Sequence, residues 1–168
     1  MPGRLRAHPL ELPLQVVLIE PEIPQNTGNI ARLCAATASP LHLVGPLGFR
    51  IDEKAVRRAG LDYWHLVDLH RHVSLSHFQH ACPGANLFLF SAHAPRSYLE
   101  APIGPGDALV FGRESVGLPA ELLAAHAPRV FAVPTLGAVR SLNLANSVGI
   151  VLFEALRRLG AMNQTFVD

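Results

Sequence analysis

The sequence is poor in the residues that mark disulfide-bonded or strongly basic proteins. Of its 168 residues only two are cysteines, Cys34 and Cys82, and they form no C-x-x-C pair, so they cannot build a disulfide framework. The formal net charge is +1, which excludes a polybasic nucleic-acid coat and leaves only local contacts with RNA or DNA. We therefore expect a protein of a reducing compartment and place it in the cytoplasm.

Long apolar runs and the common nucleotide-binding glycine motifs are also absent. No apolar stretch is long enough to span a bilayer, and prolines at positions 2, 9 and 13 interrupt the segment where a secretory signal would need a continuous apolar core. We interpret residues 1–13 as a flexible N-terminal extension and residues 14–168 as one domain. Neither G-x-G-x-x-G after the first predicted strand nor G-x-x-x-x-G-K-S/T is present, so the sequence predicts neither a Rossmann dinucleotide site nor a P-loop.

The chain is rich instead in apolar residues and, among its cations, in arginine. Hydrophobic residues make up 49% and charged residues 16% of the sequence, which leaves spare apolar surface for a contact between subunits. We therefore expect a homo-oligomer. Of the 14 basic residues all but Lys54 are arginine. Arginine suits bidentate recognition of phosphate, but a compositional bias of the genome gives the same count, and we favour that second explanation.

Short apolar runs alternate with segments of helical periodicity along the chain. Each run is closed by proline, glycine or polar residues, which is typical of buried parallel strands followed by loops. We expect strands at residues 15–19, 41–44, 63–69, 86–91, 108–111 and 129–133, and helices from about residue 27 and at 52–60, 74–82, 119–123 and 143–159. This alternation predicts a single α/β domain whose mostly parallel sheet is flanked by helices.

The last predicted helix and the loop before it form the most unusual stretch. Five of the six residues at 148–153 are large and apolar, whereas a helix on a protein surface shows a polar face at every turn. We therefore expect this helix to be covered on more than one side. Polar side chains crowd its first turns, where free backbone N–H groups and the helix dipole attract an electron-rich ligand. They are Arg140, Ser141, Asn143, Asn146 and Ser147.

Three polar clusters each follow a predicted strand, at residues 20–32, 112–117 and 135–147. Ligands of open parallel sheets bind beyond the carboxyl ends of the strands, so these clusters are candidate walls of one site. Asn29 and Arg32 lie three residues apart on a predicted helix and can share a face. Taken singly, each cluster has an ordinary explanation as a loop or a helix cap.

Four histidines at positions 70, 72, 77 and 80 lie close to Cys82 and raise the alternative of a zinc site. However, they occupy a polar loop and helix, and no second ligand pair with matching spacing occurs elsewhere. We favour solvated histidines and expect no metal.

The three clusters together resemble the three motifs of the SPOUT superfamily of RNA methyltransferases. The first motif is similar to EPEIPQNTGNIARLC at 20–34, the second to FGRESVGLP at 111–119, and the third to VP at 133–134 with RSLNLANS at 140–147. The similarity is greatest to the tRNA (cytidine/uridine) 2′-O-methyltransferases of the wobble nucleotide (the TrmL type), which RRAGLDY at 57–63 also resembles. Residues 136–139 and Arg113 depart from the pattern.

This resemblance implies an α/β fold with a C-terminal trefoil knot, S-adenosylmethionine as methyl donor, a homodimer, and tRNA as substrate. It implies a donor site lined by Phe90, Gly112, Val133 and Ser141. Catalytic roles would fall to Arg32, Glu114 and Asn146, and contacts with RNA to Asn26, Asn29 and Arg140. The sequence contains no added RNA-binding domain, so the catalytic dimer itself would hold the RNA, helped by Arg50, Arg57, Arg58 and Arg71.

The resemblance assigns the first-motif arginine, Arg32, a part in activating the 2′-hydroxyl. Because a guanidinium stays protonated in proteins, it is a very poor base. We expect Arg32 to orient the hydroxyl and to stabilise its developing charge, with Glu114, Asn29 and Asn146 as orienting groups. Three alternatives stay open: a 2′-O-methyltransferase for ribosomal RNA or another tRNA position, an RNA-binding module without catalysis, and a nicotinamide-dependent reductase, which the missing glycine fingerprint disfavours.

Overall fold

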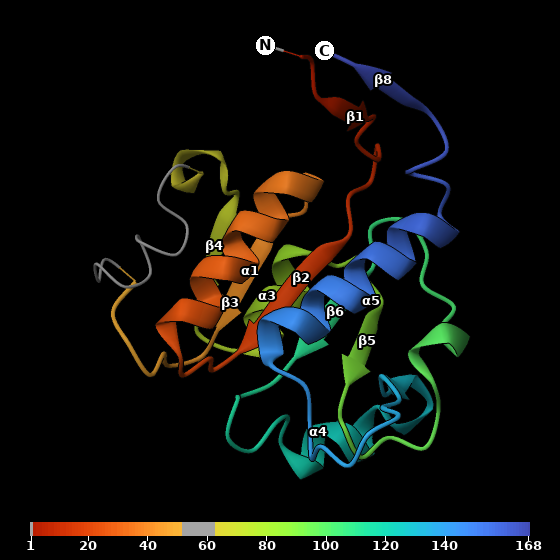
Figure 1. Ribbon diagram of the computed structural model, residues 1–168. Helices are drawn as coiled ribbons and strands as arrows, with labels where there is room; N and C mark the ends of the chain where they lie inside the picture. Colours follow the sequence, from red (N-terminus) through yellow and green to blue (C-terminus); the bar gives the residue numbers. More distant parts are fainter. Residues whose placement is uncertain (1, 52–62) are drawn as a thin grey trace.

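A six-stranded parallel sheet forms the centre of the molecule (Figure 1). We analysed a computed structural model, which describes residues 2–51 and 63–168. The strands lie in the order β4-β3-β2-β6-β5-β7, and every neighbouring pair is parallel. Their bounds are β2 Gln15–Ile19, β3 Leu41–Val44, β4 Leu69–His72, β5 Leu87–Phe90, β6 Ala108–Phe111 and β7 Val130–Phe131. The prediction of a mostly parallel sheet is confirmed.

Helices cover both faces of this sheet. Because side chains alternate along a strand, Val16 and Leu18 enter the core beneath α1 (Pro24–Thr37) and α5 (Leu144–Arg158). Val17 and Ile19 enter the opposite core, where α3 (Leu75–Ala81) and α4 (Ala120–Ala125) pack. Short 3-10 helices lie at η1 Trp64–Leu66, η2 Tyr98–Glu100 and η3 Ala127–Arg129. The continuous apolar runs of the sequence are thus explained by burial on two faces.

The segment 63–69 was wrongly predicted as a strand. Residues 64–66 form η1, which packs against α1, and the edge strand β4 begins only at Leu69. Trp64 and Val67 both contact the core beneath α1, so the apolar content that suggested a strand serves helix packing instead. The helix expected at 52–60 lies outside the described residues.

The two ends of the chain form a small antiparallel sheet that the sequence analysis missed. Strand β1 (Leu5–Ala7) pairs with β8 (Thr165–Val167), and Figure 1 shows this pair projecting away from the main sheet with both termini. The Nε of Arg6 lies 2.8 Å from a carboxylate oxygen of Asp168. Part of the predicted N-terminal extension is therefore paired, while its flexibility and the domain boundary at residue 13 stay predictions.

Helix α5 is buried along one stripe only within a single chain. Val148, Val151 and Leu152 face the core, whereas Ile150 and Phe153 remain 39% and 46% exposed. Residues 2–51 and 63–168 thus cover this helix on one side only. Among the described helices, α5 included, none has the length and apolar character needed to cross a membrane.

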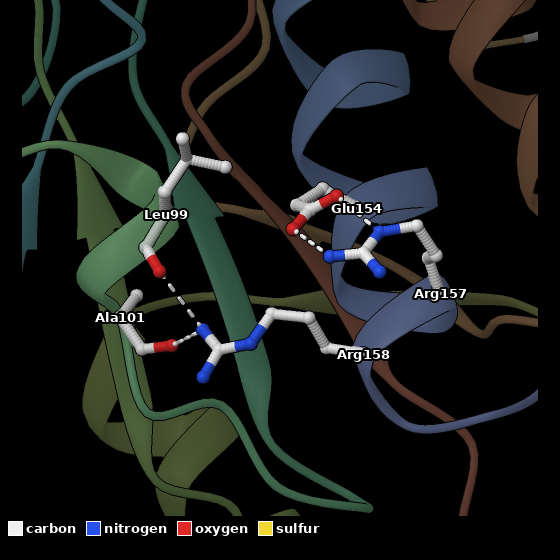
Figure 2. A network of polar contacts seen from close by, with 5 residues as sticks. All are labelled: Leu99, Ala101, Glu154, Arg157 and Arg158. Carbon is white, nitrogen blue, oxygen red and sulfur yellow. Dashed lines mark hydrogen bonds and ion pairs between the residues drawn. The ribbon is translucent and has the colours of Figure 1, made fainter.

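An arginine at the end of α5 fastens this helix to the segment that follows β5. Arg158 donates hydrogen bonds to the carbonyl oxygens of Leu99 and Ala101, at 3.1 and 2.7 Å, while Arg157 pairs with Glu154 on the helix surface (Figure 2). These carbonyls belong to η2 and its C-cap, and the carbonyl of Ala101 also accepts from the backbone N–H of Ile103 at 2.8 Å, so Arg158 supplies a second donor there. The last helix is therefore tied to a loop more than fifty residues earlier in the chain, with a separation of 57 residues for Ala101.

Candidate active site

The carboxyl ends of β2, β6, β5 and β7 lie along one edge of the sheet, and the three motif segments follow them. Phe90, Gly112 and Val133 come at or just after the ends of three neighbouring strands. The ring of Phe90 stacks on that of Phe111, with centroids 5.1 Å apart, and Val133 is half-buried. Ser141 lies in the exposed loop that leads into α5. The strand order therefore places three of the four predicted donor-site residues on adjacent strand ends.

Glu114 joins the second motif to the start of α1. Its carboxylate accepts hydrogen bonds from the backbone N–H groups of Glu22 and Ile23, at 2.8 and 3.1 Å, and from the side-chain amide of Asn26 at 3.3 Å. Ile23 is the N-cap of α1 and supplies no side-chain cap of its own, so Glu114 provides the negative group that a helix N-terminus favours. Glu114 therefore fixes the start of α1, the helix that carries Arg32.

Glu22 joins the same two motifs in the reverse sense, because here the first motif accepts hydrogen bonds from the second. Its carboxylate accepts from the backbone N–H of Ser115 at 3.1 Å and from the Ser115 hydroxyl at 2.6 Å. These two hydrogen bonds, helped by the charge of Arg113, hold the pKa of Glu22 below its ordinary value. Sequence reasoning missed both residues, because each one looks like an ordinary polar loop residue until its partner is known.

Asn26 connects the first motif to the third. It is 7% exposed, its Nδ2 donates to Glu114, and its Oδ1 accepts from Nδ2 of Asn143 at 3.0 Å. Asn143 is the N-cap of α5, where its Oδ1 accepts from the backbone N–H of Asn146. A chain of hydrogen bonds thus runs through all three motifs. The amide of Asn26 is engaged inside the protein, and its contact with RNA stays a prediction.

Arg32, Asn29 and Asn146 are exposed. Asn29 on α1 and Asn146 on α5 line the same open groove of about 740 Å³, together with Asn143. The guanidinium carbon of Arg32 lies 4.7 Å from the ring centroid of Tyr63. The structure therefore brings Asn29 and Asn146 together across two helices, as a shared site requires, and their roles stay predictions.

The glycines of the second motif shape the loop itself. A Cβ on Gly112 would lie 2.2 Å from the carbonyl carbon of Gly117 and 2.3 Å from the nitrogen of Leu118, and Gly117 has a φ of +71°. The loop closes through two backbone hydrogen bonds between Arg113 and Gly117, and Arg113 pairs with Glu20 at 3.2 Å. The backbone of this loop therefore excludes any side chain at position 112, so glycine is required there even without a ligand.

Of the arginines predicted to contact RNA, the structure describes only some. Arg140 is exposed in the loop before α5, and Arg71 is exposed on β4. Arg57 and Arg58, with most of the RRAGLDY segment, lie outside the described residues. Arg50 is exposed after β3, so the described arginines of this set lie on separate segments of the chain, and their contacts with RNA stay predictions.

The histidine segment differs from the expectation. His70, His77 and His80 are exposed as predicted, but His72 is only 7% exposed, so the prediction of solvated histidines is wrong for that residue. No group of three or more histidine, cysteine or acidic side chains in the described part of the chain is arranged to hold a metal ion.

His72 belongs to a chain of hydrogen-bonded rings between the sheet and α3. His42, which is 2% exposed, lies 2.9 Å through Nδ1 from Nε2 of His72 and 2.6 Å through Nε2 from Oε1 of Gln15. Nδ1 of His72 lies 2.9 Å from Nδ1 of His77. Burial, followed by the neighbouring histidine charges, lowers the pKa of His42 to about 4.

Comparison with known proteins gives the same assignment from the whole chain. The model of the SpoU rRNA Methylase family matches residues 13–153. A putative tRNA (cytidine(34)-2′-O)-methyltransferase of Geobacillus stearothermophilus is 47% identical over 86% of this chain and 94% of its own length. The tRNA (cytidine(34)-2′-O)-methyltransferase of Escherichia coli strain K12 is 43% identical over 88% and 94%.

Solved structures agree with this sequence similarity. A structure described as giving insight into 2-OH methylation of C/U34 on tRNA matches with a TM-score of 0.83 and 51% identity, over 87% of this chain and 95% of the other. An AdoMet-bound rRNA methyltransferase from Sinorhizobium meliloti matches with a TM-score of 0.78 and 30% identity, over 90% and 59%. The predicted SPOUT knot fold is confirmed, and the chain belongs to the SpoU methylase family.

Proposed function

We propose that this protein transfers the methyl group of S-adenosylmethionine to the ribose 2′-hydroxyl of the wobble nucleotide, cytidine or uridine, in the anticodon loop of a subset of tRNAs. The observation that carries the proposal is the hydrogen-bond chain Glu114–Asn26–Asn143, which holds the three motif segments together at the start of the helix that carries Arg32. The relatives named for this activity at position 34 are 40–47% identical along almost their whole length, with 43% for the Escherichia coli protein. A cytoplasmic location belongs to the same proposal.

The strand ends offer the groups that a bound S-adenosylmethionine needs. Phe90 and the half-buried Val133 provide apolar surface of the kind that lines nucleoside sites. Ser141 and the loop 112–117 provide hydroxyl and backbone polar groups nearby along the rim. We assign donor binding to this rim, with no part for a metal ion.

Methyl transfer requires the donor sulfur, the methyl carbon and the 2′-oxygen in line. The carbon–sulfur bond breaks as the carbon–oxygen bond forms, the sulfonium becomes a neutral thioether, and the hydroxyl proton passes to a neighbouring RNA phosphate or to water. Holding two bound reactants in this geometry supplies most of the rate. The guanidinium of Arg32 stabilises the negative charge that grows on the oxygen, because it is planar, cationic and rich in donors.

A homodimer is part of the proposal. Ile150 and Phe153 expose apolar surface on α5, and Leu33, Gly149 and Ile150 line the open groove between α1 and α5. A second copy seated there would cover α5 on its other side, as the apolar run at 148–153 suggests. Light scattering at low micromolar concentration should give twice the monomer mass of 18.1 kDa, and a monomer there would contradict a site shared between subunits.

The decisive experiment uses unmodified tRNA. The protein is incubated with total tRNA lacking modifications and with methyl-labelled S-adenosylmethionine, and the labelled nucleotide is mapped by nuclease digestion and mass spectrometry. We expect a 2′-O-methyl group on nucleotide 34 of a few tRNAs. A methyl group on a base, or label in ribosomal RNA with none in tRNA, would overturn the substrate assignment.

A further inference from the structure

Three arginines in the described part of the chain lie over aromatic rings, and only one of them is in the candidate site. Arg96 lies over Phe131 and Arg129 over Phe88, at 4.6 and 5.7 Å from the ring centroids, while Arg32 lies over Tyr63 at 4.7 Å. Such contacts are energetically favourable at distances below about 6 Å.

The other two arginines are also bound through their N–H groups. Arg96 donates to the carbonyl oxygens of Ala127 and Pro128, and Arg129 donates to Oδ1 of Asn86. Both therefore act as structural links whose donors are in use. Arg32 makes no hydrogen bond or ion pair with any described residue, so within residues 2–51 and 63–168 the ring of Tyr63 is its one partner.

We propose that Tyr63 is a positioning residue for Arg32. The ring holds one face of the guanidinium and leaves its charge and its in-plane N–H groups available. A carboxylate partner would hold the side chain as firmly but would take up two donors and offset the positive charge. An arginine that must stabilise a growing negative charge on the 2′-oxygen needs free N–H donors and a positive charge that no neighbour offsets.

The backbone of Tyr63 is fixed relative to α1, which makes the contact a built feature. Tyr63 is the N-cap of η1, and its carbonyl accepts from the N–H of Leu66 at 2.8 Å. Helix η1 packs against α1, and Trp64 contacts the core beneath that helix. The ring and the arginine are thus carried by two elements that are packed together, and the orientation of the guanidinium follows from that packing.

This inference rests on the proposed function, and its test compares matched variants on the same tRNA. Tyr63→Phe keeps the ring and removes the hydroxyl, Tyr63→Leu removes the ring, and His65→Leu changes an exposed side chain of η1 next to it. We expect Tyr63→Leu to lower kcat about 10-fold, from the loss of one cation–π contact. The KM for S-adenosylmethionine should not change, and Tyr63→Phe and His65→Leu should retain near-normal kcat.

A double-mutant cycle separates positioning from a general effect on the site. In an Arg32→Ala background, replacement of Tyr63 by leucine should cause no further loss, because its partner is already gone. An additional loss in that background, a normal kcat for Tyr63→Leu, or an equal loss in Tyr63→Phe would each overturn the inference. Wild-type protein without tRNA methylation would overturn the proposed function and this inference with it.

A spectroscopic readout keeps the test valid if the leucine variant folds poorly. In wild-type protein, side-chain methylene protons of Arg32 should be shifted upfield by the ring current of Tyr63, and the shift should persist in Tyr63→Phe. Methylene protons at ordinary arginine shifts in the wild type would overturn the inference without any measurement of activity.

Discussion

Two polar clusters of this protein use their hydrogen-bonding groups in opposite ways. In the candidate active site, Glu114 and Asn26 hold the three motif segments together. Arg32, on the same helix as Asn26, is exposed and has donors that no described residue takes up. In the histidine cluster, His42 and His72 are buried and their ring nitrogens are engaged with one another and with neighbours. The first cluster thus leaves the donors of Arg32 available to a ligand, whereas the second uses the ring nitrogens of His42 and His72 in hydrogen bonds within the protein.

The donor and acceptor roles along the histidine chain follow from its end at Gln15. Nε2 of Gln15 donates to the carbonyl of Pro13 at 3.2 Å, which turns Oε1 toward His42. An amide oxygen only accepts, so Nε2 of His42 donates to it, and Nδ1 of His42 accepts from His72. His72 then accepts at Nδ1 from His77. His42 and His72 are neutral in this arrangement, and the one lone pair of each ring is engaged in a hydrogen bond. Neither ring therefore has a lone pair left for a metal ion, which explains why this histidine-rich segment is a structural feature.

The largest expected effect comes from removing the exposed arginine of the first cluster. Arg32→Ala should lower turnover on tRNA by roughly 10²-fold or more, the scale for loss of one charge-stabilising group at a reacting centre. Affinity for S-adenosylmethionine, measured by calorimetry, should stay close to wild type. Arg32→Lys should fail as well, because an ammonium group lacks the planar fork of donors. Near-normal turnover of the alanine variant would move the catalytic role to another residue.

A smaller effect is expected where the same cluster uses its groups internally. Glu114→Gln replaces a charged acceptor of two backbone N–H groups and one amide, so unfolding in urea should be easier by about 1–3 kcal/mol. Turnover should fall with it, because the start of the helix that carries Arg32 is loosened. Glu11→Gln, at an exposed position outside the helices and strands, is the matched control and should leave both quantities unchanged. Equal stability of the two variants would show that Glu114 does not clamp α1.

The buried histidine chain should make stability depend on pH in one direction. The pKa of His42 is lowered by burial from its ordinary 6.5 to about 4, so the unfolded chain binds a proton at pH values where the folded chain does not. Stability should therefore be full above pH 6.5 and should fall by about 3 kcal/mol as the pH drops from 6.5 toward 4. Urea unfolding at several pH values and NMR titration of the His42 ring measure both quantities. A His42 ring that titrates near 6.5 would contradict the closed chain of hydrogen bonds.

The contrast between the clusters also explains what the sequence could predict. Buried parallel strands were predicted well because burial on two faces leaves continuous apolar runs, and the motif residues were found because three separated segments match one family. The pairing of Glu22 with Ser115, 93 residues apart, leaves no local signal, since its parts become neighbours only when β2 and β6 pair.

Long-range pairing explains the remaining misses in the same way. Strands β1 and β8 are three residues long and lie at opposite ends of the chain, too short for a period-two pattern to stand out. The segment 63–69 was misassigned because an apolar stretch of that length suits a strand or a short helix equally, and only its packing on α1 decides. His72 was expected to be exposed because it follows two polar residues that are exposed, His70 and Arg71, and it is the one buried residue of β4.

The smallest expected effect concerns metal removal, which tests the histidine cluster against the site directly. If the ring nitrogens of His42 and His72 are consumed by their hydrogen bonds, a chelator such as EDTA removes nothing that the protein needs, and donor affinity and turnover should both be unchanged. Calorimetry with S-adenosylmethionine before and after dialysis against chelator measures donor affinity, and methylation of tRNA measures turnover.

The control is His72→Asn, which keeps a polar side chain but breaks the chain between His42 and His77. This variant should lower stability and leave donor affinity unchanged. Loss of donor binding on chelation, restored by added zinc, would mean that the histidines hold a metal ion and that the two clusters are not separate.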